Sequence, residues 1–329
     1  MSRNEELRVQ AGDATLAGTI TLPDGPAPAD RRGRYPNVLL LPSWLPRDRD
    51  GAFDRVRHAS WFALPDDPAP GLLARLANAL ADRGVASLRC DPRGSAHSDG
   101  EWEAVSLFAR IDDARDMLAA MRSQPRLDLR RTAIVGHGEG AGAALAVAIG
   151  DPALSAVMLI GAPARSQRDV LRRGVSARAQ SGRDLRHPIV AALDWWSEEM
   201  LERAERREAS VRLRGPGRDP LTVSLAGLEQ AMHTPNLALA TMLHRSVVLV
   251  HGASDAWVSP DETALLAATL RAAGNEPLVR ELDGAGHDLA EADDATIDML
   301  ADDLASRLAP RELPPVLVAL EEMDERDMQ

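Results

Sequence analysis

The chain has 329 residues, of which 45% are hydrophobic and 27% are charged, a composition typical of a soluble globular protein and unlike that of a disordered chain. Its length would suit two average domains, but α/β folds of this size often form one, so the better prediction is one domain with an insertion. The formal net charge of −12, without a basic block, argues against a nucleic-acid partner.

The first third of the sequence predicts a hairpin followed by a strand, a helix and a strand. Residues 6–25 indicate two strands around the turn Gly12-Asp13, with alternating apolar and polar residues at 15–22. The continuous apolar run at 35–42 is typical of a strand buried on both faces of a parallel sheet. A helical pattern at 71–84 and a strand pattern at 85–91 follow.

The same alternation of strand and helix patterns continues almost to the end of the chain. Helices are predicted at 106–124, 139–150, 262–274 and 295–309, and strands at 131–136, 155–163, 246–252 and 277–282. Such alternation predicts an α/β fold with a mainly parallel central sheet and helices on both of its faces.

One segment interrupts this alternation. Residues 165–244 contain two helical patterns, and we expect no strand between them. We interpret this segment as a helical lid over the carboxyl ends of the strands, where open α/β sheets bind ligands. The predicted organisation is therefore a core of 1–164 and 245–309, a lid of 165–244 and a C-terminal tail of 310–329.

The central chemical motif lies between a predicted strand and an Ala-rich helix. The stretch Gly136-His137-Gly138-Glu139-Gly140 has the spacing of the nucleophile elbow G-x-S-x-G, in which small flanking residues allow a sharp turn. Two further loops follow later strands in the order acid and then histidine, at Asp255 and at His287.

With these motifs the chain resembles the α/β-hydrolases of the serine esterase and peptidase group over about residues 5 to 308. The resemblance implies the α/β-hydrolase fold, with His287 and Asp255 as members of a catalytic triad. The stretches Asp91-Pro92-Arg93-Gly94-Ser95 and Pro46-Arg47-Asp48-Arg49-Asp50 also match the family.

Two positions depart from the family pattern. Gly138 occupies the position of the nucleophilic serine, and it has no side chain that could form an acyl-enzyme. The oxyanion loop has Ser43-Trp44-Leu45 where relatives usually place His-Gly or Gly-rich residues. The backbone N–H of Glu139, at the start of the helix, is a candidate for half of an anion site.

Several side chains near these loops have a structural explanation as well as a functional one. Glu139 suits the first turn of a helix, and His137 is expected to serve packing or hydrogen bonding. Trp195, Trp196 and Trp257 are candidates for lining a pocket for an aromatic substrate, although core or lid packing explains them equally well.

The leading hypothesis is an enzyme whose His287–Asp255 dyad performs acid–base chemistry without a covalent intermediate. Water-activated hydrolysis of a carboxyl ester or related bond would qualify, and so would lyase or C–C bond chemistry. One alternative is a ligand-binding protein without catalysis. Another is a serine esterase or peptidase inactivated by the exchange of serine for Gly138.

The sequence predicts a small-molecule substrate and no cofactor. No spacing of His, Cys and Asp matches a zinc site, and the glycines at 136–142 lack the lysine of a P-loop. The chain starts without a signal-peptide pattern, has the single cysteine Cys90 and contains no run of about 18 apolar residues. We therefore expect a cytoplasmic protein without a membrane span.

Overall fold

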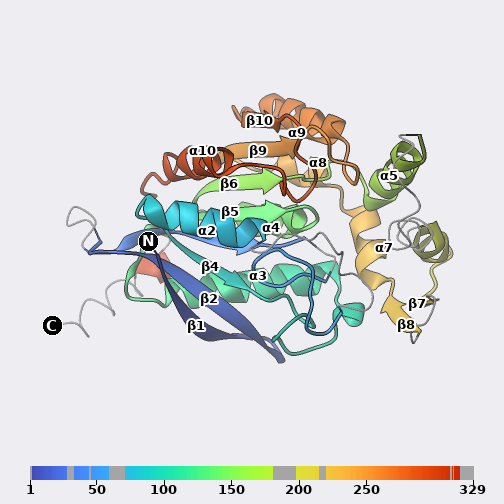
Figure 1. Cartoon of the computed structure of the whole chain (residues 1–329), viewed down its shortest axis with the longest axis horizontal. Coiled ribbons are helices and arrows are strands. Elements are labelled where there is room, and N and C mark those ends of the chain that lie inside the picture. Colours follow the sequence, from blue (N-terminus) through green and yellow to red (C-terminus); the bar gives the residue numbers. More distant parts are fainter. Residues whose placement is uncertain are drawn as a thin grey trace.

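The computed structural model describes residues 2–27, 33–43, 46–58, 71–180, 198–214, 220–311, 313 and 315–318. The centre of the fold is one eight-stranded sheet (Figure 1). In chain order its strands are β1 (Ser2–Ala11), β2 (Ala14–Pro23), β3 (Tyr35–Leu41), β4 (Ala86–Cys90), β5 (Leu127–His137), β6 (Leu154–Ile160), β9 (Ser246–Gly252) and β10 (Leu278–Leu282).

The spatial order of the strands is β1-β2-β4-β3-β5-β6-β9-β10. The pairs β1–β2 and β2–β4 are antiparallel, and all the other neighbours are parallel. The chain leaves β3 toward β4 on one side and returns to β5 on the other, so a topological switch point lies between β3 and β5. Ligands of open α/β sheets bind at the carboxyl ends of the strands at such a point.

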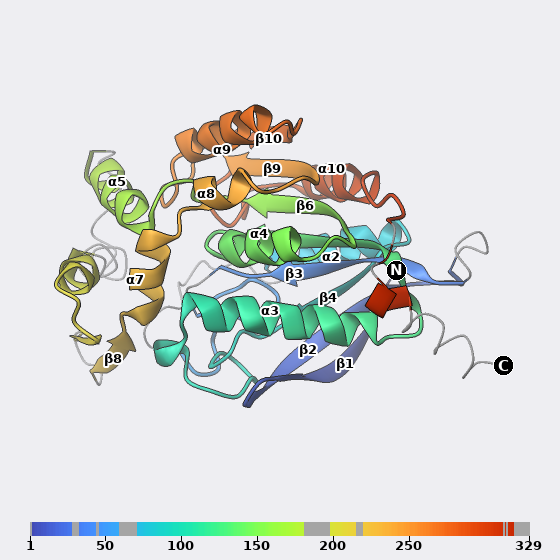
Figure 2. The same cartoon turned by 180° about the vertical axis from the view of Figure 1, so that it is seen from behind.

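Helices cover both faces of this sheet, so the predicted α/β fold is confirmed. One face carries α2 (Leu72–Asp82) and α10 (Asp294–Ala305), which lie in front in Figure 1. The opposite face carries α3 (Leu107–Arg122), α4 (Gly140–Gly150) and α9 (Pro260–Ala272), which lie in front in Figure 2. Each face has its own apolar core. Every residue of β3, β4 and β6 is buried, as expected of strands covered on both sides.

The N-terminal hairpin also forms as predicted. Its strands pair in register from Ser2 opposite Pro23 to Ala11 opposite Ala14. The turn requires φ of +55° at Gly12, a conformation that glycine adopts without steric cost.

The insertion between β6 and β9 contains α5 (Gln167–Gln180), β7 (Ser210–Leu213), β8 (Leu221–Ser224), α7 (Ala226–His233) and α8 (Asn236–Ala240). The prediction that no strand separates its helical patterns was wrong, because β7 and β8 form an antiparallel pair. Val211, Leu213 and Val223 are buried at alternate positions of these strands, which is the period-two pattern of a half-buried sheet.

An apolar cluster joins the insertion to the carboxyl end of the core. Val211, Leu213 and Leu228 of the insertion belong to one buried cluster with Phe53 and Trp102 of the loops after β3 and β4. Trp102 begins the short 3-10 helix η2 (Trp102–Ala104). The insertion is therefore packed beside the ends of the strands that carry the motifs (Figure 1).

Helix α3 begins at a capping residue whose contribution is measurable. The Oγ of Ser106 accepts a hydrogen bond from the backbone N–H of Ala109 at 3.1 Å. Ser106→Ala should lower the free energy of unfolding by about 1 kcal/mol, because one N–H of the first turn loses its partner. Ser123→Ala, at the other end of the same helix, is the control. The free energy of unfolding of both variants can be measured by urea denaturation. If both variants lose the same free energy, Ser106 is not the cap.

Within the described residues, every helix is too short or too polar to cross a lipid bilayer.

Candidate active site

The motif predicted as an elbow forms a sharp turn between β5 and α4. Strand β5 ends at His137 and α4 begins at Gly140, so only Gly138 and Glu139 connect them. Gly138 has φ of +55°, and its N–H donates to the carbonyl oxygen of Ile160 at 2.8 Å. A Cβ on Gly140 would lie 2.4 Å from the carbonyl oxygen of Pro42, which explains why a glycine is needed there. The turn holds residue 138 at the carboxyl edge of the sheet.

His287 and Asp255 meet beside this turn, although they come from different loops. Nδ1 of His287 lies 2.7 Å from Oδ2 of Asp255. The other carboxylate oxygen, Oδ1, accepts the backbone N–H groups of Trp257 at 2.8 Å and Val258 at 2.9 Å. With Nδ1 directed at the carboxylate, Nε2 of His287 faces Gly138, and a Cβ on that glycine would lie 3.0 Å from Nε2. The imidazole is thus oriented as a base toward the position of the absent side chain.

The charges around the dyad favour an imidazolium–carboxylate pair. Burial lowers the pKa of His287, but the charge and hydrogen bond of Asp255, with the charges of Asp288 and Glu139, outweigh it and raise this pKa to about 9. Burial raises the pKa of Asp255, but the charge and hydrogen bond of His287 hold it below its ordinary value. Nε2 of His287 therefore carries a proton at neutral pH and becomes a base as the pH approaches 9.

Polar contacts of His137 and Arg47 hold the loop that carries His287. Nε2 of His137 lies 3.0 Å from the carbonyl oxygen of His287, and the centroids of the two rings are 4.8 Å apart. Burial, together with the charge of His287, lowers the pKa of His137 to about 4, so its ring is neutral at neutral pH. Asp288 forms an ion pair with the buried guanidinium of Arg47 at 3.0 Å, which ties the histidine loop to the loop after β3.

One group of side chains in the described part of the chain has a geometry that metal ligands can adopt. The ligand atoms of His137, His287 and Asp288 all lie within 4.8 Å of one another. A cation held there would have to displace Arg47 from Asp288 and would lie beside the positively charged His287. The site as it stands is therefore arranged for ion pairing among its own residues.

Ser43 approaches the elbow from the opposite side. Its Oγ donates to Oε2 of Glu139 at 2.5 Å, and Nε2 of Gln167 donates to Oε1 of the same carboxylate at 3.3 Å. A Cβ on Gly138 would lie only 2.8 Å from Oγ of Ser43. The hydroxyl of Ser43 and the imidazole of His287 thus flank the space in which a side chain at residue 138 would begin.

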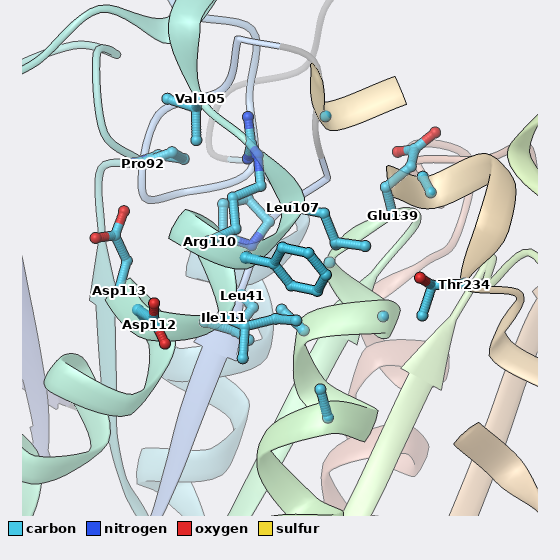
Figure 3. Close-up of a pocket in the computed structure, with 18 of the residues that line it drawn as sticks. Leu41, Pro92, Val105, Leu107, Arg110, Ile111, Asp112, Asp113, Glu139 and Thr234 are labelled. Carbon is cyan, nitrogen blue, oxygen red and sulfur yellow. The ribbon is translucent and has the colours of Figure 1, made fainter. Parts of the chain in front are cut away.

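A cavity of about 330 Å³ opens beside Glu139 and extends between α3 and α4 (Figure 3), and His287 is not among the residues that line it. Its walls are mainly apolar, with contributions from Leu16, Leu41, Val105, Leu107, Ile111 and Met117. Figure 3 shows Glu139 and Thr234 on the side opposite Asp112 and Asp113. The cavity meets the elbow at Glu139 and Gly140.

Charged side chains in the cavity wall are balanced by opposite charges. Arg93 pairs with Asp113 at 2.7 Å, and Arg115 pairs with Asp112 at 2.8 Å. Burial lowers the pKa of Arg110 to about 10, against the charges of Glu139 and Asp113, so this guanidinium stays protonated at neutral pH. Such a wall suits an uncharged apolar group.

Of the three predicted pocket tryptophans, the described part of the chain includes Trp257 alone. Trp257 packs against the cluster that contains Phe53, and it is not among the residues that line the cavity. Trp195 and Trp196 lie outside the described residues, and so does Trp44 of the predicted oxyanion loop.

Two supporting contacts were not found from the sequence. Nε2 of the buried His251 lies 3.4 Å from Oδ2 of Asp255, and His251 is held by the hydroxyl of Thr263 and the carbonyl of Val258. Arg47 and Asp288 are 241 positions apart. His251 lies within the predicted acid loop, but no sequence pattern indicates which of its neighbours touches the carboxylate.

Comparison with known proteins gives a family match and several similar folds. A sequence profile of the family described as serine aminopeptidase, S33, matches residues 70–294. No curated protein matches the sequence. The structure is similar to the esterase domain of a Rhodothermus marinus protein, with 18% identity and a TM-score of 0.57 over 94% of this chain and 100% of that chain.

Two other solved structures are similar at low identity. A Pyrococcus furiosus esterase is 12% identical, with a TM-score of 0.61 over 94% of this chain and 92% of that chain. Est1E of Butyrivibrio proteoclasticus, solved with bound ferulic acid, is also 12% identical, with a TM-score of 0.59 over 91% of this chain and 96% of that chain. These likenesses establish a shared fold. Because the family profile covers more than half of the sequence, the chain belongs to the serine aminopeptidase S33 family of α/β-hydrolases.

Proposed function

We propose that this chain is an enzyme that hydrolyses a carboxyl ester, or a related bond of a small organic molecule, through the His287–Asp255 dyad and without a covalent intermediate at residue 138. The observation that carries the proposal is the orientation of His287. Its Nδ1 is held by Asp255 at 2.7 Å, and its Nε2 faces the space above Gly138. Membership of a hydrolase family supports the reaction class.

In the proposed reaction, neutral His287 takes a proton from a water molecule as the water oxygen bonds to the carbonyl carbon. The tetrahedral intermediate then expels the leaving oxygen, which receives that proton from His287. The products are a carboxylic acid and an alcohol, and the histidine returns to its neutral form. We expect the backbone N–H of Glu139, which precedes α4, to supply part of the oxyanion site.

The cavity supports an apolar group as one part of the substrate. Its volume of about 330 Å³ is roughly twice that of an engineered apolar cavity that binds benzene. Its balanced charges disfavour a charged group at depth. The insertion of residues 165–244 would act as a lid that excludes water from this substrate, because its apolar cluster contacts the loops after β3 and β4.

The proposal predicts that turnover rises with pH. His287 must lose its proton before it can act as a base, and the raised pKa means that this loss occurs near pH 9. Initial rates on an activated ester such as a p-nitrophenyl ester, measured from about pH 6 to about pH 10, should increase with an apparent pKa near 9. A rate that is constant or falls over this range would contradict the proposed role of His287.

A second candidate, a ligand-binding protein without catalysis, is favoured by the apolar cavity alone. The two candidates differ in what His287→Ala does. A catalyst loses turnover and keeps ligand-induced thermal stabilisation, whereas a binding protein shows stabilisation and no turnover in either form.

A further inference from the structure

We propose that Ser43 and Glu139 form the second half of a water site, in which the Ser43 hydroxyl holds the reacting water opposite His287. This assignment rests on the proposed hydrolytic function and names two further residues for it. The position of the site follows from Gly138, because the Oγ of Ser43 and the Nε2 of His287 lie 2.8 Å and 3.0 Å from the point where a Cβ of residue 138 would lie. A water just beyond this point is within hydrogen-bonding reach of both groups.

The donor and acceptor roles around this water are complementary. The Oγ of Ser43 donates its only hydrogen to Oε2 of Glu139 at 2.5 Å, so its lone pairs remain to accept a hydrogen from water. Neutral His287 accepts the other hydrogen at Nε2, since its Nδ1–H is directed at Asp255. With both hydrogens engaged, the lone pairs of the water face the substrate, which is the orientation required for attack.

Glu139 is the group that fixes this arrangement. Its carboxylate receives the Ser43 hydroxyl at one oxygen and the amide of Gln167 at the other. The positive charge of Arg110 lies near enough to interact with the charge of Glu139. A carboxylate held in this way can only accept from Ser43, so the serine hydroxyl cannot turn its hydrogen toward the water.

Ser43 and a side chain at residue 138 would compete for the same space. A Cβ at 2.8 Å from Oγ is closer than real contacts of this kind, so the Ser43 hydroxyl would have to shift if residue 138 carried a side chain. In this proposal the glycine at residue 138 and the polar side chain at residue 43 act together, and a bound water takes the place of a covalent nucleophile.

The test compares kcat and KM on an activated ester for Ser43→Ala, Ser43→Thr and Glu139→Gln. Ser43→Ala should lower kcat by more than about tenfold and leave KM unchanged, because a misplaced water reacts slowly although the substrate still binds. The apparent pKa near 9 should also remain, since His287 is intact. Ser43→Thr retains a hydroxyl and should keep most of the kcat of the unaltered protein. Glu139→Gln should lower kcat as Ser43→Ala does, because the serine hydroxyl is no longer fixed.

The matched control is Ser155→Ala. Ser155 is a buried serine at the amino end of the sheet, and its hydroxyl donates to the carbonyl of Ala309 at 2.7 Å. The Ser155→Ala variant should keep the kcat of the unaltered protein. Thermal melts should show that all variants are folded. Ser43→Ala with a loss below about tenfold would overturn the water site. A serine-directed phosphonate that forms an adduct on Ser43 would also overturn it, because Ser43 would then be a nucleophile.

Failure of the proposed function gives a different result. If His287→Ala loses turnover while Ser43→Ala does not, only the water site is wrong. If the unaltered protein hydrolyses none of the esters tested, the proposed function is wrong and the water site falls with it.

Discussion

Replacing His287 by alanine should lower the turnover of an activated ester near pH 9 by a factor on the order of 10² to 10⁴. Its imidazole is the base in the proposed reaction, and the neighbouring His137 cannot replace it. His137 is buried beneath the ring of His287, with its Nε2 directed at the carbonyl oxygen of that residue. Steady-state rates measured at the same pH for both proteins would quantify the loss.

The matched control for this experiment is His244→Ala, because His244 is exposed in the loop before β9. This variant should keep the rate of the unaltered protein. Asp255→Asn should also be slow, since an amide no longer fixes the proton of His287 on Nδ1. Turnover of His287→Ala within about tenfold of the control would show that the reaction does not depend on the dyad.

Restoring a serine at the elbow should require two substitutions. In Gly138→Ser alone, the new Cβ would lie 2.8 Å from the Ser43 hydroxyl and 3.0 Å from His287, so at least one of these groups must move. In the double variant Ser43→Gly with Gly138→Ser, the first of these contacts is removed. We therefore expect the double variant to react with a serine-directed phosphonate on the order of 100-fold faster than Gly138→Ser.

The label should be found on residue 138 by mass spectrometry of the digested protein. Ser43→Gly with Gly138→Ala is the control, since it has the same space and no hydroxyl. The positive φ of residue 138 means that both double variants should be less stable than the parent by about 1–3 kcal/mol, and thermal melts should show this equally in both. Equal, slow labelling of the single and double serine variants would show that crowding by Ser43 is not what limits acyl transfer.

Local patterns in the sequence were sufficient to predict most of the fold. Strands β3 and β6 are short apolar runs, and their burial on both faces leaves little choice of element. The β7–β8 pair was missed because four-residue strands carry too little periodicity to be separated from the adjoining helical patterns. Strands β7 and β8 are defined by their pairing with each other, and they do not join the main sheet.

The sequence by itself determined which loops carry the chemistry, because Gly138, Asp255 and His287 each follow a predicted strand at a recognisable motif. It also determined that residue 138 has no nucleophilic atom. Only the tertiary structure decided what surrounds that position. The 2.5 Å contact of Ser43 with Glu139 and the ion pair of Arg47 with Asp288 join residues 96 and 241 positions apart. Local propensity cannot specify such contacts, since they arise only when the packed sheet brings the carboxyl ends of its strands to one edge.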